Sequence, residues 1–377
     1  TDRSGNSVYL FGAGASSEGD RPFVDELNVR TRANTRWWRS EAPYYEQPVA
    51  IIDPAKRTFV ILRESDQQVP NYYLHNGPKL VAITQRTDPY AGLGGLPRTQ
   101  PLRYQRPDGR PAAATLHLPA GYQTSDGPLP TIVEVSPALF FDSTATSQVQ
   151  GSRHSFARYG WNSALYWTAR GYAVVQNLTL PVPQANGAAP ATTYARQLAQ
   201  ATGAALAEGR RMGFVDTARA MVLGQGPGAF LATRLLADSR LFKAGIVLTG
   251  LHNPPLPNPL PGEEQPPLPL GAAFSPADAP AFPFALTDTL RRPLLVLPAG
   301  FDGVPADLAA RTEQFYAELQ RQGGSRVRYA PLPGETHGYT ARESLMQLLA
   351  EINSWLDTHI QPAADRQSAA TLPTSTD

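Results

Sequence analysis

The chain has 377 residues, of which 42% are hydrophobic and 17% charged, a composition typical of a globular protein with one large domain and a smaller one. Its 33 Lys and Arg residues nearly balance its 32 Asp and Glu residues, so bulk charge favours neither nucleic acid nor an anionic membrane surface as a partner. The absence of cysteine excludes disulfides, thiolate zinc sites and a cysteine nucleophile.

The sequence opens with TDRSGNSVYLFGAG, without an initiator Met, and it contains no apolar run long enough to span a membrane. We expect a soluble fragment or a processed product, exported or organellar if an N-terminal signal preceded it. The sequence itself does not identify the compartment.

Residues 1–95 predict antiparallel β-structure, because short runs rich in β-branched and aromatic residues alternate with polar turns. Residues 8–12 and 59–63 begin similar units, and a repeat of about 50 residues is typical of β-propeller blades. We interpret this region as about two blades of a partial propeller. Because an open blade edge leaves backbone groups unpaired, we expect missing sequence or another chain to complete it. A small independent sheet is the alternative. The strand-like runs are VYLFGAG, TRWWRS, AIIDPAKRTFVILRES, NYYLHN and KLVAITQ.

Residues 96–361 predict the α/β class, with an α/β-hydrolase fold in which helices flank a mostly parallel sheet. Nearly continuous apolar strands such as LPTIVEV, ARAMVLG and RPLLVLPAG alternate with helical stretches such as GAFLATRLLADS. In ARESLMQLLAEINSWLDTHI the apolar residues recur at helical spacing on one face. Residues 362–377 are rich in Ala, Ser, Thr and Asp, and we expect them to form a disordered tail.

A sharp glycine turn is expected between AMVL and the helix GAFLATRLLADS. In an α/β-hydrolase this turn presents the nucleophile in the pattern G-x-S-x-G, and here residues 224–228 read GQGPG. The outer glycines fit, because the strained turn and the close approach of strand and helix exclude a β-carbon. The central position is Gly226, which has no side chain that could attack a substrate.

Two further residues occur in the chain order of an α/β-hydrolase triad, which is nucleophile, acid and base. Asp302 follows the strand RPLLVLPAG, and His337 lies in GETHGY after the strand RVRYAPL. In a complete triad the imidazole accepts the serine proton while the carboxylate orients the ring. Without the hydroxyl, we interpret Asp302 and His337 as triad remnants, and a hydrogen-bonded structural pair is favoured over a catalytic one.

These motifs together resemble the glutamyl endopeptidase branch of the prolyl oligopeptidase family, from roughly Tyr9 to Ile360. The matching segments include FGAGASSEGDRPFVDEL, RESDQQVPNYYL, LGQGPGAFLATRLLADSRLFKAGIVLTG and ETHGYTARES. The resemblance implies a peptidase that acts through an acyl-enzyme, with a propeller restricting access to the site. It places the nucleophile at Gly226, the acid at Asp302 and the base at His337.

The resemblance also implies a degenerate oxyanion hole. The residue after the nucleophile normally donates its N–H, which Pro227 lacks, and the family's second donor, usually a Tyr hydroxyl, falls at Ser136. Losing one oxyanion donor costs about 10²–10³ in rate, and losing a serine nucleophile costs on the order of 10⁶. The sequence therefore predicts a serine peptidase homologue that is a pseudoenzyme and binds a peptide or protein partner. The glycine at position 226 could also come from a laboratory Ser-to-Gly substitution. The altered flanking residues Gln225 and Pro227 favour natural loss of the active site instead.

A weakly active peptidase or esterase is a second hypothesis, in which Asp302 and His337 activate water or another hydroxyl such as that of Ser136. A dinucleotide-binding protein is a third, because GQGPGA matches G-x-G-x-x-A. The acidic ribose ligand expected at the end of the next strand is missing, so this hypothesis is disfavoured.

We expect no cofactor and no metal. The six His residues are scattered and lack ligand spacing, and His154 and His252 are interpreted as ordinary loop or core histidines.

Overall fold

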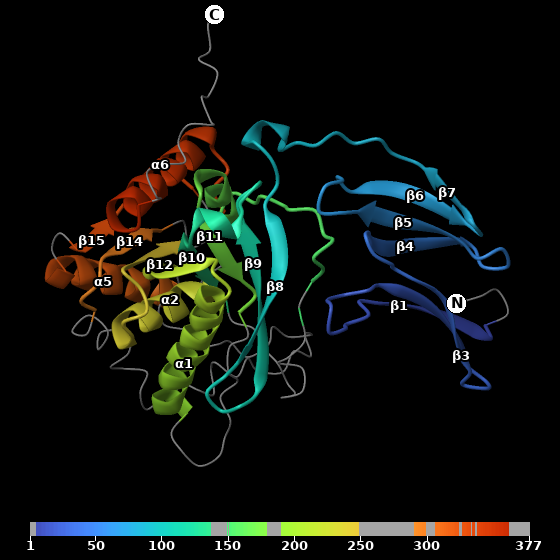
Figure 1. Cartoon of the computed structure of the whole chain (residues 1–377), viewed down its shortest axis with the longest axis horizontal. Coiled ribbons are helices and arrows are strands. Elements are labelled where there is room, and N and C mark those ends of the chain that lie inside the picture. Colours follow the sequence, from blue (N-terminus) through green and yellow to red (C-terminus); the bar gives the residue numbers. More distant parts are fainter. Residues whose placement is uncertain are drawn as a thin grey trace, which may run out of the picture. The chain divides into compact units, whose positions relative to one another are not determined.

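The computed structural model describes residues 5–136, 149, 151–178, 190–248, 290–298, 306–323, 326–332, 334–335 and 338–361. The chain divides into two compact units, which Figure 1 shows with their strands and helices. The first unit comprises Thr1–Pro101 and Ser147–Arg158, and the second comprises Leu102–Thr146 and Tyr159–Asp377. A short segment that lies between two strands of the second unit in sequence therefore belongs to the first.

The first unit contains two antiparallel sheets, one of three strands in the order β1-β2-β3 and one of four in the order β4-β5-β6-β7. Val24, Phe59 and Ile61 form its buried apolar core, against which Trp37 and Trp38 pack. The strands are β1 Ser7–Gly12, β2 Phe23–Asn28, β3 Asn34–Arg39, β4 Tyr45–Asp53, β5 Thr58–Glu64, β6 Asn71–Asn76 and β7 Lys79–Ala82.

The sequence predicted most of these strands but not β2. The polar residues of β2 obscure the alternation of apolar and polar side chains that indicates a strand. In β2 the carboxylate of Asp25 is buried and accepts hydrogen bonds from Arg36 at 2.6 and 3.1 Å and from Asn34 at 2.9 Å. The second repeat was predicted to begin at residue 59, but Phe59 lies in the second strand of its sheet, because β4 precedes β5 and pairs with it. The strand β4 was less apparent because it contains Pro48 and alternates only weakly in burial.

The second unit is built on an eight-stranded sheet in the order β15-β14-β13-β12-β10-β11-β9-β8. The pairs from β15 to β11 are parallel, and β9 runs antiparallel to β11. This is the mostly parallel sheet of the predicted α/β-hydrolase fold. The strands are β8 Arg98–Gln105, β9 Pro111–Leu118, β10 Leu129–Val135, β11 Ala173–Gln176, β12 Val215–Gln225, β13 Ala244–Leu248, β14 Leu294–Leu297 and β15 Val327–Tyr329.

Helices cover this sheet, so its central strands are buried on both faces. In β12, Met221, Val222 and Leu223 are all at most 1% exposed, as expected for strands that read as continuous apolar runs. α1, α2 and α5 share one core cluster with the sheet, whereas α6 contacts β14 and the indole N–H of Trp355 donates to Gly245 O of β13 at 3.1 Å. The helices are α1 Pro190–Arg211, α2 Pro227–Asp238, α5 Ala306–Gly323 and α6 Arg342–His359, with short 3₁₀ turns η1 Ala91–Leu93, η2 Thr124–Asp126 and η4 Ala164–Arg170.

Candidate active site

The turn between β12 and α2 has the geometry predicted for a nucleophile elbow. The strand ends at Gln225, the helix begins at Pro227, and Gly226 between them has φ 53° and ψ −123°. This backbone region is readily accessible only to glycine. The N–H of Gly226 donates to Leu248 O at the end of β13, at 3.2 Å, which fixes the turn against the neighbouring strand.

The two outer glycines of GQGPG are required by close backbone contacts. A β-carbon on Gly224 would lie 2.1 Å from Gly228 O, and one on Gly228 would lie 2.2 Å from Val135 O. These distances confirm the prediction that the approach of strand and helix excludes a β-carbon at both positions. A β-carbon on Gly226, in contrast, would meet no atom within 4 Å among the described residues, so none of these residues excludes a side chain there.

The candidate residues follow strands whose carboxyl ends lie at one edge of the parallel sheet. Gly226 follows β12, and Ser136 follows the adjacent β10, where it is exposed with its Cα 3.5 Å from a β-carbon built on Gly228. The structure therefore brings Ser136 next to the elbow. Asp302 and His337 lie outside the described residues, and only their places in the sequence, after β14 and after β15, relate them to this edge.

The first turn of α2 lacks one backbone donor. Pro227 is the first residue of this helix, and it has no N–H to offer to a ligand above the elbow. The helix tolerates proline there because the first N–H groups have no partner within the helix. The donor that the residue after a nucleophile normally supplies is therefore absent.

Tyr339 fixes the segment that follows His337 onto the end of β14. Its hydroxyl donates to Leu297 O at 3.0 Å and to Pro298 O at 2.8 Å. The side chain is buried, and burial raises the pKa of the Tyr339 phenol above its ordinary value, so the group remains a donor at neutral pH. These two hydrogen bonds hold Tyr339 beside the end of β14. Asp302 follows this strand in sequence.

Glu335 holds the end of the same segment, at the start of α6. Its carboxylate accepts from the N–H of Thr340 at 2.8 Å and of Ala341 at 3.0 Å. A side-chain hydrogen bond from Ser344, together with these backbone donors, lowers the pKa of Glu335 below its ordinary value. The sequence analysis missed this role, although an acidic residue shortly before an amphipathic helix is a capping signal.

Trp161 and Asn162 link the elbow to the segment around His337. The Asn162 amide donates to Gln225 Oε1. The ring of Trp161 lies 4.8 Å from that of Tyr339, and its Nε1 would be 3.6 Å from a β-carbon on Gly338. No local pattern in the sequence indicated these contacts, because the residues are more than 60 positions from Gln225 and about three times as far from Tyr339.

A buried polar network lies on the strands beside the elbow. Gln176 of β11 donates to Glu134 of β10 at 2.7 Å. Burial raises the pKa of Glu134 and lowers that of His117, on β9, to about 4. Both groups are therefore biased toward their neutral forms by the cost of burying charge.

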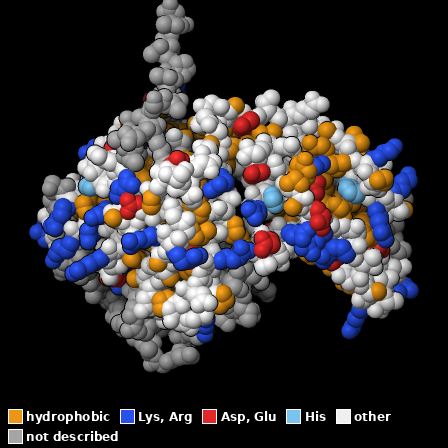
Figure 2. Space-filling model, in the orientation of Figure 1, with side chains coloured by type: hydrophobic (Ala, Val, Ile, Leu, Met, Phe, Trp, Pro, Cys, Tyr) orange, Lys and Arg blue, Asp and Glu red, His pale blue; other side chains and the backbone are white. Residues whose placement is uncertain are grey.

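Figure 2 shows Lys and Arg side chains spread over the visible face, with acidic and apolar side chains among them. Among the described residues, no three His, Asp or Glu side chains gather in an arrangement that could hold a metal ion. Within the same part of the chain, no helix has the length and apolarity needed to cross a membrane.

Comparison with known proteins relates the chain to serine peptidases. A probable chloroplastic glutamyl endopeptidase of Arabidopsis thaliana is 33% identical over 372 residues, which cover 95% of this chain and 38% of the relative. The chain thus spans well under half the length of that relative. No family model matches the sequence.

Solved structures show the same fold over nearly the whole chain. The AtxE2 isopeptidase S527A variant with bound Astexin3-dC4 superposes with a TM-score of 0.65 at 18% identity, over 97% of this chain and 55% of that one. The acylaminoacyl peptidase of Pyrococcus horikoshii gives a TM-score of 0.58 at 16% identity, over 94% of this chain and 54% of that one.

Proposed function

We propose that this chain, which belongs to the prolyl oligopeptidase family of serine peptidases and matches its glutamyl endopeptidase branch, is a non-catalytic pseudopeptidase that serves as a binding or structural subunit. The observation that carries the proposal is Gly226 at the turn between β12 and α2. The backbone has the geometry that presents a nucleophile, and the residue supplies only a hydrogen.

The surroundings of the turn support the same conclusion. Pro227 removes one oxyanion donor, and Ser136 stands where the family usually places a Tyr hydroxyl. One lost donor costs about 10²–10³ in rate, and the lost nucleophile costs on the order of 10⁶. The proposed partner is a peptide or protein segment held above the elbow, where no atom of the described residues lies within 4 Å of a β-carbon built on Gly226.

The test compares the wild-type protein with Gly226→Ser in labelling by a fluorophosphonate probe and in hydrolysis of peptides that contain Glu. Because the turn already has the nucleophile conformation and room for a side chain, Gly226→Ser should become labelled if Asp302 and His337 still assemble. Gly226→Ser/His337→Ala is the matched control and should lose the label. The wild type should show neither labelling nor turnover.

A steady turnover by the wild type that His337→Ala abolishes would refute the pseudopeptidase proposal. Such a result would favour the second candidate, a weak hydrolase that uses a hydroxyl other than that of residue 226. The position of Ser136, exposed at the end of β10 and beside Gly228, is the observation in its favour. Wild-type activity that Ser136→Ala removes would assign it.

We also propose that residues 1–95 are about two blades of a partial β-propeller completed by further β-structure, from another chain or from other sequence. Exposed large apolar side chains occur mainly in the first unit among the described residues, as expected for surfaces that pack against missing strands. Cross-linking mass spectrometry on the protein from its own cells should place β1 or β7 against additional β-rich sequence. Recovery as a monomer with no such cross-link would refute this. The exposed large apolar side chains of the first unit are Leu10, Phe11, Val29, Val49, Ile52, Val81 and Ile83.

The name of the Arabidopsis relative gives its location as chloroplastic. An organellar compartment for this chain follows from it only as a proposal, which fractionation of the source cells would test.

A further inference from the structure

The amino ends of the parallel strands in the second unit lie at one edge of the sheet, opposite the edge that carries Gly226. The six strands from β15 to β11 are parallel to their neighbours, so they share one orientation. Helices that connect parallel strands run back antiparallel to them, so α1, α2 and α5 end at the same edge. This amino edge gathers Lys and Arg side chains from strand starts and helix ends.

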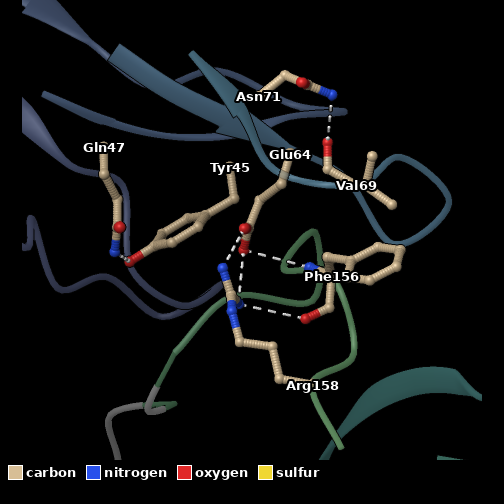
Figure 3. Close-up of polar contacts among 7 residues, drawn as sticks. All are labelled: Tyr45, Gln47, Glu64, Val69, Asn71, Phe156 and Arg158. Carbon is tan, nitrogen blue, oxygen red and sulfur yellow. Dashed lines mark hydrogen bonds and ion pairs between the residues drawn. The ribbon is translucent and has the colours of Figure 1, made fainter. Parts of the chain in front are cut away.

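Six arginines at or near the amino edge are paired with acids, so a ligand could use them only if those pairs were broken. Similar pairs occupy arginines of the first unit, where the buried carboxylate of Glu64 accepts from Arg158 (Figure 3). The pairs of the amino edge are Arg170–Asp357, Arg211–Glu208, Arg219–Asp216, Arg234–Asp238, Arg321–Glu318 and Arg328–Glu351, with N···O distances of 2.6–3.4 Å.

Five further cations of the amino edge have no acidic partner among the described residues, and we name these five the basic edge. Arg210 lies in the last turn of α1, Arg240 and Lys243 lie between α2 and β13, and Arg291 and Arg292 shortly precede β14. Arg292 is half-buried and the other four are exposed. Four of the five side chains are therefore open to a partner in solution.

Backbone hydrogen bonds hold Lys243 and Arg292 at neighbouring strand starts. Lys243 N donates to Ala220 O of β12 at 2.9 Å, and Gly245 N donates to Pro293 O at 2.9 Å. The backbones that carry Lys243 and Arg292 thus run side by side, about 4.8 Å apart. Like charges on neighbouring strands repel each other, and a bound anion would remove that cost.

The connection that carries Arg240 and Lys243 packs on α1, whose last turn contains Arg210. Leu241 lies within this connection, and its Cδ2 would be 3.4 Å from a β-carbon on Gly203 of α1. The ends of α1 and α2 each carry a partial negative charge of about 0.5, so together they offset about one of the five positive charges. A positive surface remains at the amino edge.

The composition of the basic edge distinguishes between anionic partners. Four of its five residues are arginines, whose planar fork pairs with a carboxylate or a phosphate through two hydrogen bonds. Membrane surfaces usually take up apolar side chains beside the cations, and single-stranded nucleic acid stacks on aromatic ones. Among the described residues, the large apolar side chains that are exposed lie elsewhere, in the first unit and at Met346 near the start of α6.

Acidic side chains close to the basic edge also disfavour a phosphate polymer. Glu208 and Asp238 lie within two residues of Arg210 and Arg240 in sequence. A duplex carries a dense and continuous row of phosphates, which such acids repel. An acidic protein segment carries separate carboxylates on an adaptable chain, so it can meet the cations and avoid the acids.

We propose that the basic edge is an interaction surface for a protein segment rich in Asp and Glu, whose carboxylates pair with Lys243, Arg291 and Arg292 as the segment crosses the starts of β13 and β14. The net charge of the chain is only +1, so this surface results from local concentration of cations. The proposal goes beyond the pseudopeptidase function and does not depend on it, because the basic edge and Gly226 lie at opposite edges of the sheet.

The test measures binding of a fluorescent synthetic peptide of Glu and Gly by anisotropy, with a peptide of Gln and Gly of the same length as the neutral match. The wild type should bind the Glu peptide in about 50 mM salt and release it in about 0.5 M salt, where charges are screened. The combined variant Lys243→Gln/Arg291→Gln/Arg292→Gln should bind about tenfold more weakly, because each exposed ion pair contributes a factor of about two to three.

The matched control is Arg30→Gln/Arg32→Gln/Lys79→Gln, which removes the same charge from exposed positions of the first unit. It should change the affinity by less than about twofold. Circular dichroism checks that each variant is folded. Should the triple variant of the basic edge fail to fold, Arg210→Gln/Arg240→Gln takes its place, because both side chains are exposed, and it should weaken binding about fivefold.

Equal binding of the Glu and Gln peptides by the wild type would overturn the proposal, because carboxylates would then not be recognised. Equal weakening in the first-unit control would also overturn it, since general charge attraction would explain the binding. Duplex DNA and phosphatidylglycerol vesicles are measured in parallel. Tighter binding of either than of the Glu peptide, lost in the variant of the basic edge, would assign the surface to phosphates and refute the acidic protein segment.

Discussion

The geometry of the elbow predicts that three glycines of the second unit respond differently to the same substitution by alanine. Gly228→Ala places a β-carbon 2.2 Å from Val135 O, and backbone lies on both sides of the contact. Gly226→Ala meets nothing within 4 Å among the described residues but must hold φ 53°. Gly203, inside α1, would bring its β-carbon to 3.4 Å from Leu241, an ordinary contact.

The magnitudes follow from these contacts. A steric overlap that only a shift of the backbone can relieve costs about 3 kcal/mol, the upper part of the range for overpacking. A non-glycine residue at positive φ without a clash costs about 1–2 kcal/mol. A helical glycine replaced by alanine gains about 0.5–1 kcal/mol. From most to least stable, the expected order is Gly203→Ala, wild type, Gly226→Ala and Gly228→Ala.

Guanidinium unfolding followed by circular dichroism measures the order, with the free energy of unfolding of each variant taken relative to wild type. Equal costs for Gly226→Ala and Gly228→Ala would contradict the elbow geometry, because one site is open and the other is filled by backbone. A neutral Gly228→Ala would contradict the close approach of α2 to β10. Gly203→Ala serves as the control that alanine itself is not harmful.

Three further predictions concern groups near the site. Burial lowers the pKa of His117 in the folded protein to about 4, against an ordinary 6.5, so the unfolded state takes up a proton first as pH falls. Between pH 7 and pH 5 the free energy of unfolding of the wild type should therefore fall by about 2 kcal/mol more than that of His117→Gln. Equal decreases in the two proteins would show that His117 is not buried. Glu335→Gln should speed amide exchange at Thr340 and Ala341 about tenfold. Because the folded pKa of Glu335 is lowered, this effect is fully present above the ordinary carboxyl pKa and is lost as pH falls through the lowered folded pKa. A ratio of exchange rates that does not change with pH would show that the negative charge of Glu335 does not hold these amides. Tyr339→Phe removes a buried hydroxyl donor shared by two backbone carbonyls and should lower the free energy of unfolding by about 1–2 kcal/mol. An unchanged midpoint of guanidinium unfolding would mean that water or another group replaces the lost hydroxyl.

Local chemistry made the second unit and its elbow predictable from the sequence. Continuous apolar strands and periodic helices specify a parallel sheet covered on both faces. Gly224 and Gly228 could be assigned to a close strand–helix contact because only glycine fits there, and the backbone contacts in the structure agree. The proposal that no nucleophile stands at position 226 rests on the identity of one residue in a recognisable turn, and it remains a prediction.

The long-range polar contacts of both units were not predictable, because they join residues distant in sequence. Glu64 and Arg158 are separated by 94 positions and Asn162 and Gln225 by 63, and neither pair belongs to a local motif. Residues 151–158 lie in sequence between β10 and β11 of the second unit, yet their tertiary contacts group them with the first unit. The strand β2 was missed for a related reason, since its buried Asp25 is acceptable only with Arg36 beside it.

The proposal that Gly226 stands where a nucleophile would stand has a physical consequence beyond the chemistry. A serine at position 226 would hold φ 53° at a cost of about 1–2 kcal/mol, which a working hydrolase tolerates because the strain exposes the hydroxyl. Gly226 adopts the same conformation without that cost, and the flanking contacts that force the conformation remain in place. On the pseudopeptidase proposal, the turn has the shape of a nucleophile elbow without its strain, as expected where stability and binding matter and turnover does not. On this argument Gly226→Ser, even if it restores labelling, should unfold at lower denaturant than the wild type, and a more stable Gly226→Ser would show that the elbow was still built for a nucleophile.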